Sequence, residues 1–323
     1  MSAPAVVALG GGHGLAASLQ ALTQVTSALT AVVTVADDGG SSGRLRDELG
    51  LLPPGDLRMA LCALAAPDEW GRSWQSLLQH RFPGSGPLAG HAVGNLLLAG
   101  LTETEGGMVQ ALDLVARLVG ARGRVLPASV VPLRIVAQVL GLDPTDPGHL
   151  DRVVGQVAVA TTSGTVVAVS LEPERPPACE QALEAIRAAD AVVLGPGSWF
   201  TSVLPHLLVP ELRAALTETA ATRIVVLNLA EQAGETAGYS PQAHVDVLAA
   251  HAPEIVPDVV LADERAVLDT RGLMSAVEAL GGRLVLAPLA LGDGTPRHDP
   301  TRLAAAYSRI LKDRTATKGP AWR

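Results

Sequence analysis

Aromatic and basic side chains are scarce in this chain of 323 residues. Aromatic residues make up 2% of it, and lysine occurs only at Lys312 and Lys318. The formal net charge is −8 and no stretch clusters arginine and lysine, so the sequence lacks the basic patch with which proteins bind DNA or RNA. We therefore expect no nucleic-acid partner.

Cysteine and long apolar runs are also nearly absent. Cys62 and Cys179 lie far apart, with no Cys-x-x-Cys pair or His/Cys cluster, which argues against a disulfide scaffold and a zinc site. We expect both thiols to be buried as small hydrophobic groups. No window reaches about 18 uncharged apolar residues, and no basic leader precedes the first apolar run. These features predict a cytoplasmic protein without a membrane span.

Apolar residues make up 48% of the chain and charged residues 17%, which is enough apolar material for a large core. Short β-branched runs, such as residues 5–9, 29–35, 191–194 and 223–228, alternate with segments of helical periodicity. This alternation predicts an α/β fold with a doubly wound, mostly parallel sheet. We expect a single domain over residues 1–323, a small β-rich lobe inserted at about 125–171, and a flexible tail at 315–323.

The first predicted strand runs into a glycine-rich turn that leads into a helix. It comprises Gly10, Gly11, Gly12, His13 and Gly14. Glycines let backbone amides and a helix N-terminus approach an anion closely, so the turn predicts a phosphate or pyrophosphate site, with a purely structural turn as the alternative. Leu15 stands where a dinucleotide fingerprint needs glycine, which disfavours an NAD-dependent oxidoreductase.

A second glycine-rich stretch after the run at 29–35 carries two adjacent carboxylates. Its candidate ligand-binding residues are Asp37, Asp38, Gly39, Ser41 and Ser42. Successive side chains diverge in an extended segment, so we expect either Asp37 or Asp38 to hold a ribose hydroxyl or a hydrated Mg²⁺ while the other orients the loop. An Asx-type turn with both acids in water is the alternative.

Further polar groups follow at other predicted strand ends and helix starts. Asp56 and Arg58 begin a helix, where Asp56 suits an N-cap and the Arg58 guanidinium suits phosphate. The remaining candidates are Asn95, Gly195, Pro196, Gly197, Ser198, Thr201, Ser202, Asn228, Gln232, Glu235 and Thr236. Trp199 and Phe200 could cover a base or sugar, or wedge the helix against the core. Carboxyl ends of parallel strands meet at one edge, so these loops are expected to form one site.

Taken together, these motifs resemble the YvcK-type gluconeogenesis factor family, which belongs with the phospholactate transferases to the CofD-like superfamily. The matching segments, in family order, are residues 10–15, 33–45, 53–58, 94–97, 195–198 and 234–236. The resemblance implies a Rossmann-like CofD fold, binding of a UDP-sugar such as UDP-N-acetylglucosamine, and a role in bacterial cell shape and gluconeogenic growth. In the transferase group it implies a guanine nucleotide, a deazaflavin and Mg²⁺.

The leading hypothesis is a metabolite-binding regulator that clamps a UDP-sugar without turnover. The alternative is a nucleotide-linked transferase in which Asp37 or Asp38 holds Mg²⁺ and Arg58 stabilises charge on a phosphoryl group. No G-x-S-x-G or His-Glu-x-x-His motif indicates a hydrolase. The catalytic residues, the oligomeric state, including a homodimer, and the protein partner that reads the bound state stay open.

Overall fold

A seven-stranded parallel sheet forms the centre of the computed structural model, which describes residues 3–232 and 234–317. Its strand order is β10-β9-β8-β7-β1-β2-β3, and every neighbouring pair is parallel. The strands are β1 (Ala5–Gly10), β2 (Ala28–Val33), β3 (Arg124–Pro127), β7 (Ala191–Leu194), β8 (Thr222–Val226), β9 (Val259–Asp263) and β10 (Arg283–Ala287). The predicted α/β class with a mostly parallel sheet is confirmed.

The strand order reverses direction between β1 and β7. From β1 the chain proceeds through β2 to β3 on one side, and from β7 it proceeds through β8 and β9 to β10 on the other. Because parallel crossovers are right-handed, the two directions place their helices on opposite faces of the sheet. In open α/β sheets, ligands bind outside the carboxyl ends of the strands at such a reversal.

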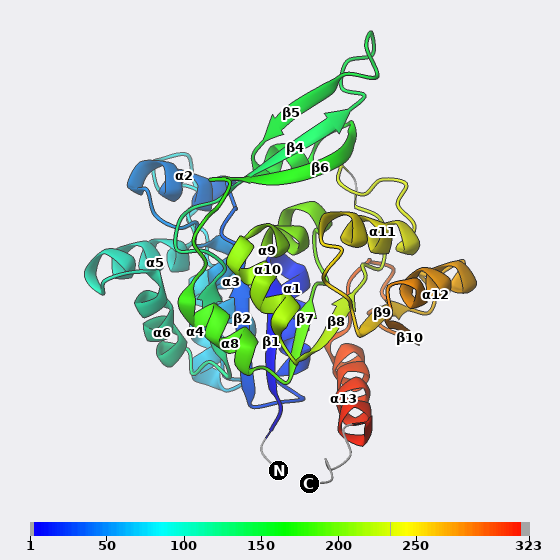
Figure 1. Cartoon of the computed structure of the whole chain (residues 1–323). Helices are drawn as coiled ribbons and strands as arrows, with labels where there is room; N and C mark the ends of the chain where they lie inside the picture. The colour runs from blue at the N-terminus through cyan, green and yellow to red at the C-terminus, as the bar shows by residue number, and fades with distance from the viewer. Residues whose placement is uncertain (1–2, 233, 318–323) are drawn as a thin grey trace.

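Helices cover both faces of the sheet (Figure 1). α1 packs against α3 and α13, and α8 packs against α10. The helices before β3 are α1 (Gly12–Leu22), α2 (Gly40–Leu49), α3 (Gly55–Leu64), α4 (Glu69–Gln79), α5 (Val93–Thr104) and α6 (Met108–Leu118). Those after the lobe are α8 (Glu180–Ala188), the π-helix η1 (Trp199–Val203), α9 (Leu204–Leu208), α10 (Pro210–Glu218), α11 (Pro241–His251), α12 (Thr270–Ala279) and α13 (Pro300–Thr317).

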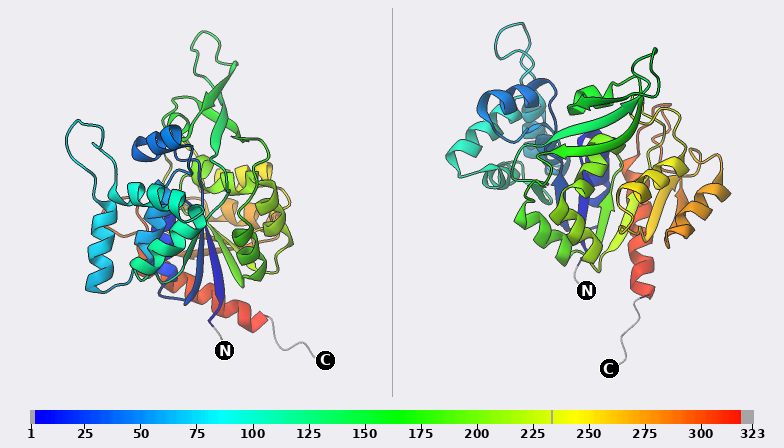
Figure 2. Two further views of the ribbon diagram at one scale, coloured as in Figure 1. Left: turned by 90° about the vertical axis from the view of Figure 1, so that its left-hand side faces the viewer. Right: turned by 45° about the horizontal axis from the view of Figure 1, so that its top comes forward.

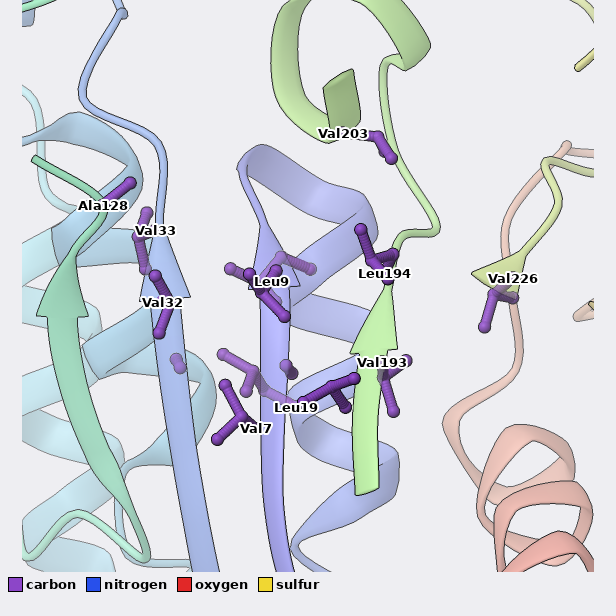
Figure 3. Close-up of a cluster of buried hydrophobic side chains, with 14 of the residues drawn as sticks. Val7, Leu9, Leu19, Val32, Val33, Ala128, Val193, Leu194, Val203 and Val226 are labelled. Carbon is purple, nitrogen blue, oxygen red and sulfur yellow. The ribbon is translucent and has the colours of Figure 1, made fainter. Parts of the chain in front are cut away.

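The core lies between the sheet and these helices. Strands β1 and β7 are buried almost completely, as expected for parallel strands covered on both faces. Figure 3 shows Leu9 of β1 beside Leu194 of β7, with Leu19 of α1 packed against the same pair of strands. Both cysteines are buried and free, as predicted. The two strands that flank the reversal therefore lie in the middle of the hydrophobic core.

A small antiparallel lobe stands over the carboxyl edge of the sheet (Figures 1 and 2). It contains three strands in the order β5-β4-β6, namely β4 (Arg134–Leu140), β5 (Leu150–Val154) and β6 (Thr165–Glu172), together with the short helix α7 (Gln156–Ala160). The lobe was predicted from residue 125. It begins later, because residues 124–127 form β3 and pair with β2 in the main sheet.

Three local predictions differ from the structure. No helix was predicted at residues 40–49, whose first part was assigned to a glycine-rich loop, but these residues form α2. The stretch predicted as a β-rich lobe also contains a helix, because α7 follows Gly155, whose φ of +105° ends β5. Residues 315–317 of the expected tail belong to α13, and residues 318–323 lie outside the described residues.

Candidate functional site

The two glycine turns predicted to converge lie against each other at the reversal point of the sheet. The first follows β1 and the second follows β7, its parallel neighbour. A Cβ atom on Gly14 would lie 2.3 Å from the Pro196 carbonyl oxygen and 2.7 Å from the Gly197 Cα. Glycine is therefore required at position 14, and the predicted convergence of the two turns is confirmed.

The first turn directs backbone amides outward from the start of α1. Gly11 is extended, Gly12 has a φ of +59°, and the first intrahelical bond is donated by the Leu15 N–H to the Gly11 oxygen. The Gly12 N–H donates to the Asp56 carboxylate. The amides of His13 and Gly14 precede the first intrahelical bond, so they can donate to an anion. The His13 side chain is exposed.

Asp56 lies directly behind this turn. A Cβ on Gly11 would come within 2.5 Å of Asp56 Oδ2 and 3.2 Å of Ser202 Oγ, so glycine at position 11 lets both polar groups approach. Burial, reinforced by the negative charge of Asp37, raises the pKa of Asp56 to about 7, although the Gly12 amide and Arg58 oppose the shift. Asp56 thus faces the first glycine turn instead of acting as a surface N-cap, a position that Pro54 takes.

Asp37 and Asp38 diverge, as predicted for adjacent residues. Asp37 Oδ1 accepts from the Gly39 N–H at 2.9 Å, and a Cβ on Gly55 would lie 2.5 Å from Asp37 Oδ2. Asp38 Oδ1 instead accepts from the Val157 N–H at 3.0 Å and caps α7. Asp37 therefore belongs with Asp56, whereas Asp38 fastens the lobe to the sheet edge.

Arg58 is a buried guanidinium with spare donors. It is 3% exposed, and its Nε and Nη1 atoms have no hydrogen-bond partner among the described residues. A Cβ on Gly94 would lie 2.9 Å from the Arg58 Cγ and Cδ atoms, so glycine there makes room for the side-chain stem. Burial lowers the pKa of Arg58, while Asp56 and Asp37 act against the shift. Buried polar groups are normally paired, so these donors are suited to an anionic ligand.

Ser41 and Asn95 belong to a buried network that also includes His91. Asn95 Nδ2 donates to Ser41 Oγ at 3.0 Å, and Ser41 Oγ lies 3.0 Å from His91 Nδ1. Ser41 also lines a hollow of about 620 Å³ together with Asp38, Arg44, Asp47 and Glu48. His91 was not among the predicted candidates, although it lies just before α5, the helix that carries Asn95.

The second glycine turn is held by side chains that were predicted to bind ligand. The Gly197 N–H donates to Asn228 Oδ1 at 3.0 Å, and Asn228 Nδ2 donates to the Gly197 oxygen at 2.8 Å and to Gln232 Oε1 at 3.2 Å. The Gln232 N–H donates to Thr236 Oγ1 at 2.9 Å. In this structure these groups bond to one another and to the turn, and so hold the turn in its conformation.

Glu235 accepts hydrogen bonds from the polar groups that follow the second turn. Its carboxylate accepts from Ser198 Oγ at 2.5 Å, from Thr201 Oγ1 at 2.7 Å and from the Phe200 N–H at 3.3 Å. Glu235 is 4% exposed. Ser198 and Thr201, which were predicted to bind ligand, are therefore already paired with a carboxylate of the protein itself.

Trp199 and Phe200 wedge the helix against the core, which was one of the two predicted roles. They are buried, and the Trp199 ring lies 5.2 Å from that of His244.

Among the described residues, no helix is long and apolar enough to cross a membrane. Nor does that part of the chain bring three His, Cys, Asp or Glu side chains together as a metal site.

Fold and site define an α/β protein in which two glycine-rich turns meet at the reversal of a parallel sheet. The family model described as "2-phospho-L-lactate transferase CofD" matches residues 6–278. The chain therefore belongs to the CofD family.

Relatives place the chain near the gluconeogenesis factors of this family. A Mycobacterium tuberculosis protein named "Putative gluconeogenesis factor" is 53% identical over 319 residues, covering 98% of this chain and 93% of the relative. The "Gluconeogenesis factor" of Listeria monocytogenes is 34% identical over 326 residues, covering 98% of both chains. A crystal structure of a UPF0052-family protein from Bacillus halodurans superposes with a TM-score of 0.84 at 34% identity, covering 95% of this chain and 99% of that one. The resemblance to YvcK-type proteins is confirmed.

Proposed function

We propose that this protein binds a nucleoside diphosphate sugar at the reversal point and acts as a regulatory protein of cell shape and gluconeogenic growth. The observation that carries the proposal is the first turn of α1. Gly14 of this turn lies against Pro196 and Gly197, where the sheet reverses direction. Such a turn binds phosphate through backbone donors and the helix dipole.

Arg58 supplies the positive charge that the turn lacks. Its guanidinium is buried, and its charge interacts with those of Asp56 and Asp37. Asp56 lies against the first turn, and Asp37 lies in the loop between β2 and α2. The Arg58 Nε and Nη1 donors, which have no partner in the part of the chain that the structure describes, match the oxygens of a diphosphate. The uridine and N-acetylglucosamine parts of the proposed ligand rest on the family resemblance.

A thermal-shift panel tests the proposal. UDP-N-acetylglucosamine, UDP, UMP and uridine are compared, with and without Mg²⁺. A true ligand at a hundredfold excess over its Kd stabilises the folded state by about 2.7 kcal/mol. We expect a shift with the two diphosphates and none with uridine. Equal shifts for uridine and the diphosphates, or no shift with any compound, would contradict a diphosphate site.

The second candidate is a nucleotide-linked transferase, which the paired carboxylates favour. The charge of Asp37 helps to raise the Asp56 pKa, and two such carboxylates with ligand phosphates suit Mg²⁺. When bound, Mg²⁺ would neutralise charge on the phosphates. Asp37 and Asp56 would hold the Mg²⁺, because Asp38 already accepts a hydrogen bond from the Val157 N–H of α7. Binding that needs Mg²⁺ and is lost in Asp37→Asn would favour a transferase; binding unaffected by Mg²⁺ would count against it.

A further inference from the structure

The Glu235 carboxylate accepts hydrogen bonds from a group of donors that lies just after the second glycine turn. The hydroxyls of Ser198 and Thr201 and the amide of Phe200 all donate to its carboxylate. These donors follow the turn that touches Gly14. Charge-assisted hydrogen bonds of this kind are stronger than neutral ones, and the low exposure of Glu235 keeps water from weakening them.

The residues around Glu235 also contact the lobe. Gly234 has a φ of +86°, and a Cβ there would lie 2.2 Å from the Ala160 oxygen at the end of α7. Tyr239 Oη donates to the Val166 oxygen of β6 at 3.4 Å. Figure 1 shows the segment before α11 rising to the lobe. The position of Glu235 is therefore tied to the position of α7 and β6.

The other end of α7 is fixed to the opposite side of the site. Asp38, in the loop after β2, caps α7 through the Val157 N–H at 3.0 Å. A Cβ on Gly155 would lie 2.2 Å from Asp38 Oδ2, so the contact is close. The short helix α7 thus bridges the loop after β2 and the segment that carries Glu235.

We propose that Glu235 is an internal competitor of the ligand's phosphates, and that its displacement signals occupancy to the lobe. The inference rests on the proposed function. A diphosphate held by the His13 and Gly14 amides repels the carboxylate across the two touching turns. Glu235 then leaves Ser198 and Thr201, and residues 234–239 withdraw from Ala160 and Val166. The lobe, still held through Asp38, changes its position relative to the sheet.

The test compares Glu235→Gln with the wild-type protein, and uses Glu278→Gln as the matched control. Glu278 is exposed on α12, so this control makes the same change in charge away from the site. Binding of UDP-N-acetylglucosamine is measured by titration calorimetry, and amide exchange of residues 134–172 by mass spectrometry. We expect Glu235→Gln to bind at least about tenfold more tightly, because a neutral amide competes less well than a carboxylate.

The exchange measurement separates this proposal from the proposed function. In the wild-type protein, ligand should speed exchange in the lobe; in Glu235→Gln, exchange should already be faster without ligand. If neither protein binds nucleotide sugar, the proposed function fails, while the ligand-free exchange still tests the tie between Glu235 and the lobe. Weaker or unchanged binding in a folded Glu235→Gln protein, or unchanged lobe exchange, would overturn the inference.

A second variant keeps the proposal testable if Glu235→Gln does not fold. Glu235→Asp keeps the charge but is one methylene shorter, so it reaches Ser198 and Thr201 less well. We expect its affinity to lie between those of the wild-type protein and Glu235→Gln. Affinity below that of the wild-type protein would mean that Glu235 helps to hold the ligand, and would overturn the competitor role.

Discussion

Arg58 gives the sharpest prediction, because its replacement should change stability and binding in opposite directions. Arg58→Met keeps an apolar stem of similar length in the space beside Gly94 and removes the guanidinium. In the ligand-free protein this guanidinium is buried with two nitrogen atoms unpaired among the described residues. The wild-type protein therefore bears a desolvation cost that the variant avoids.

The expected magnitudes follow from this geometry. A buried unsatisfied donor costs about 1–3 kcal/mol, so the free energy of unfolding should rise by about that amount. The attraction between Arg58 and Asp56 opposes the gain, and this opposition is weakest below pH 7, where the raised pKa of about 7 keeps Asp56 protonated. Losing one partner of a buried charge pair costs about 2–5 kcal/mol in binding, which is about 30-fold to several thousand-fold in Kd.

Urea unfolding at about pH 5.5 measures the stability, where Asp56 is mostly protonated, and titration with UDP-N-acetylglucosamine measures the binding. Arg117→Met is the control, because Arg117 is exposed on α6 and its removal makes the same change in net charge. A folded Arg58→Met protein that is less stable than wild type yet binds the ligand equally well would refute the reasoning, since Arg58 would then be a structural residue.

Two further predictions concern the glycine turns and Asp56. Gly14→Ala should lower the free energy of unfolding by about 1–3 kcal/mol, because its Cβ would lie 2.3 Å from the Pro196 oxygen. The control Gly100→Ala, where a Cβ meets nothing within 4 Å, should be neutral or stabilising in urea unfolding; equal losses would refute the close approach. The folded-state pKa of Asp56, about 7, lies above its ordinary value of 3.8, so its contribution to stability is greatest below the lower value and is lost as the pH rises to about 7. Between about pH 5 and about pH 8, the free energy of unfolding should therefore fall less in Asp56→Asn than in the wild-type protein. An identical pH dependence of the two proteins would show that the pKa of Asp56 is not raised.

The sequence was sufficient to predict the sheet and the meeting of the two glycine turns. The continuous apolar runs at β1, β2 and β7 mark strands buried on both faces, and parallel strands bring their following loops to one edge. The same pattern placed Asp56 and Arg58 near the site, although it left Asp56 equally suited to an ordinary N-cap.

Features that depend on distant partners were not predictable. α7 is capped by Asp38, which lies 119 positions earlier in the chain, so its own residues resemble a continued strand. α2 begins in a glycine- and serine-rich stretch, and Ser41 is held there by Asn95 of α5. Glu235 was predicted to bind ligand from its position after a strand, and no local signal shows that it bonds to Ser198 and Thr201.

Backbone NMR can show directly whether the first turn of α1 receives the ligand's phosphates. The protein, labelled at glycine and histidine, is titrated with UDP-N-acetylglucosamine while the amide signals of His13 and Gly14 are followed. We expect large downfield shifts of both amides, because each gains a charged acceptor, with small shifts for the remote Gly100. Saturation with the ligand while both signals stay unmoved would contradict an anion site at this turn.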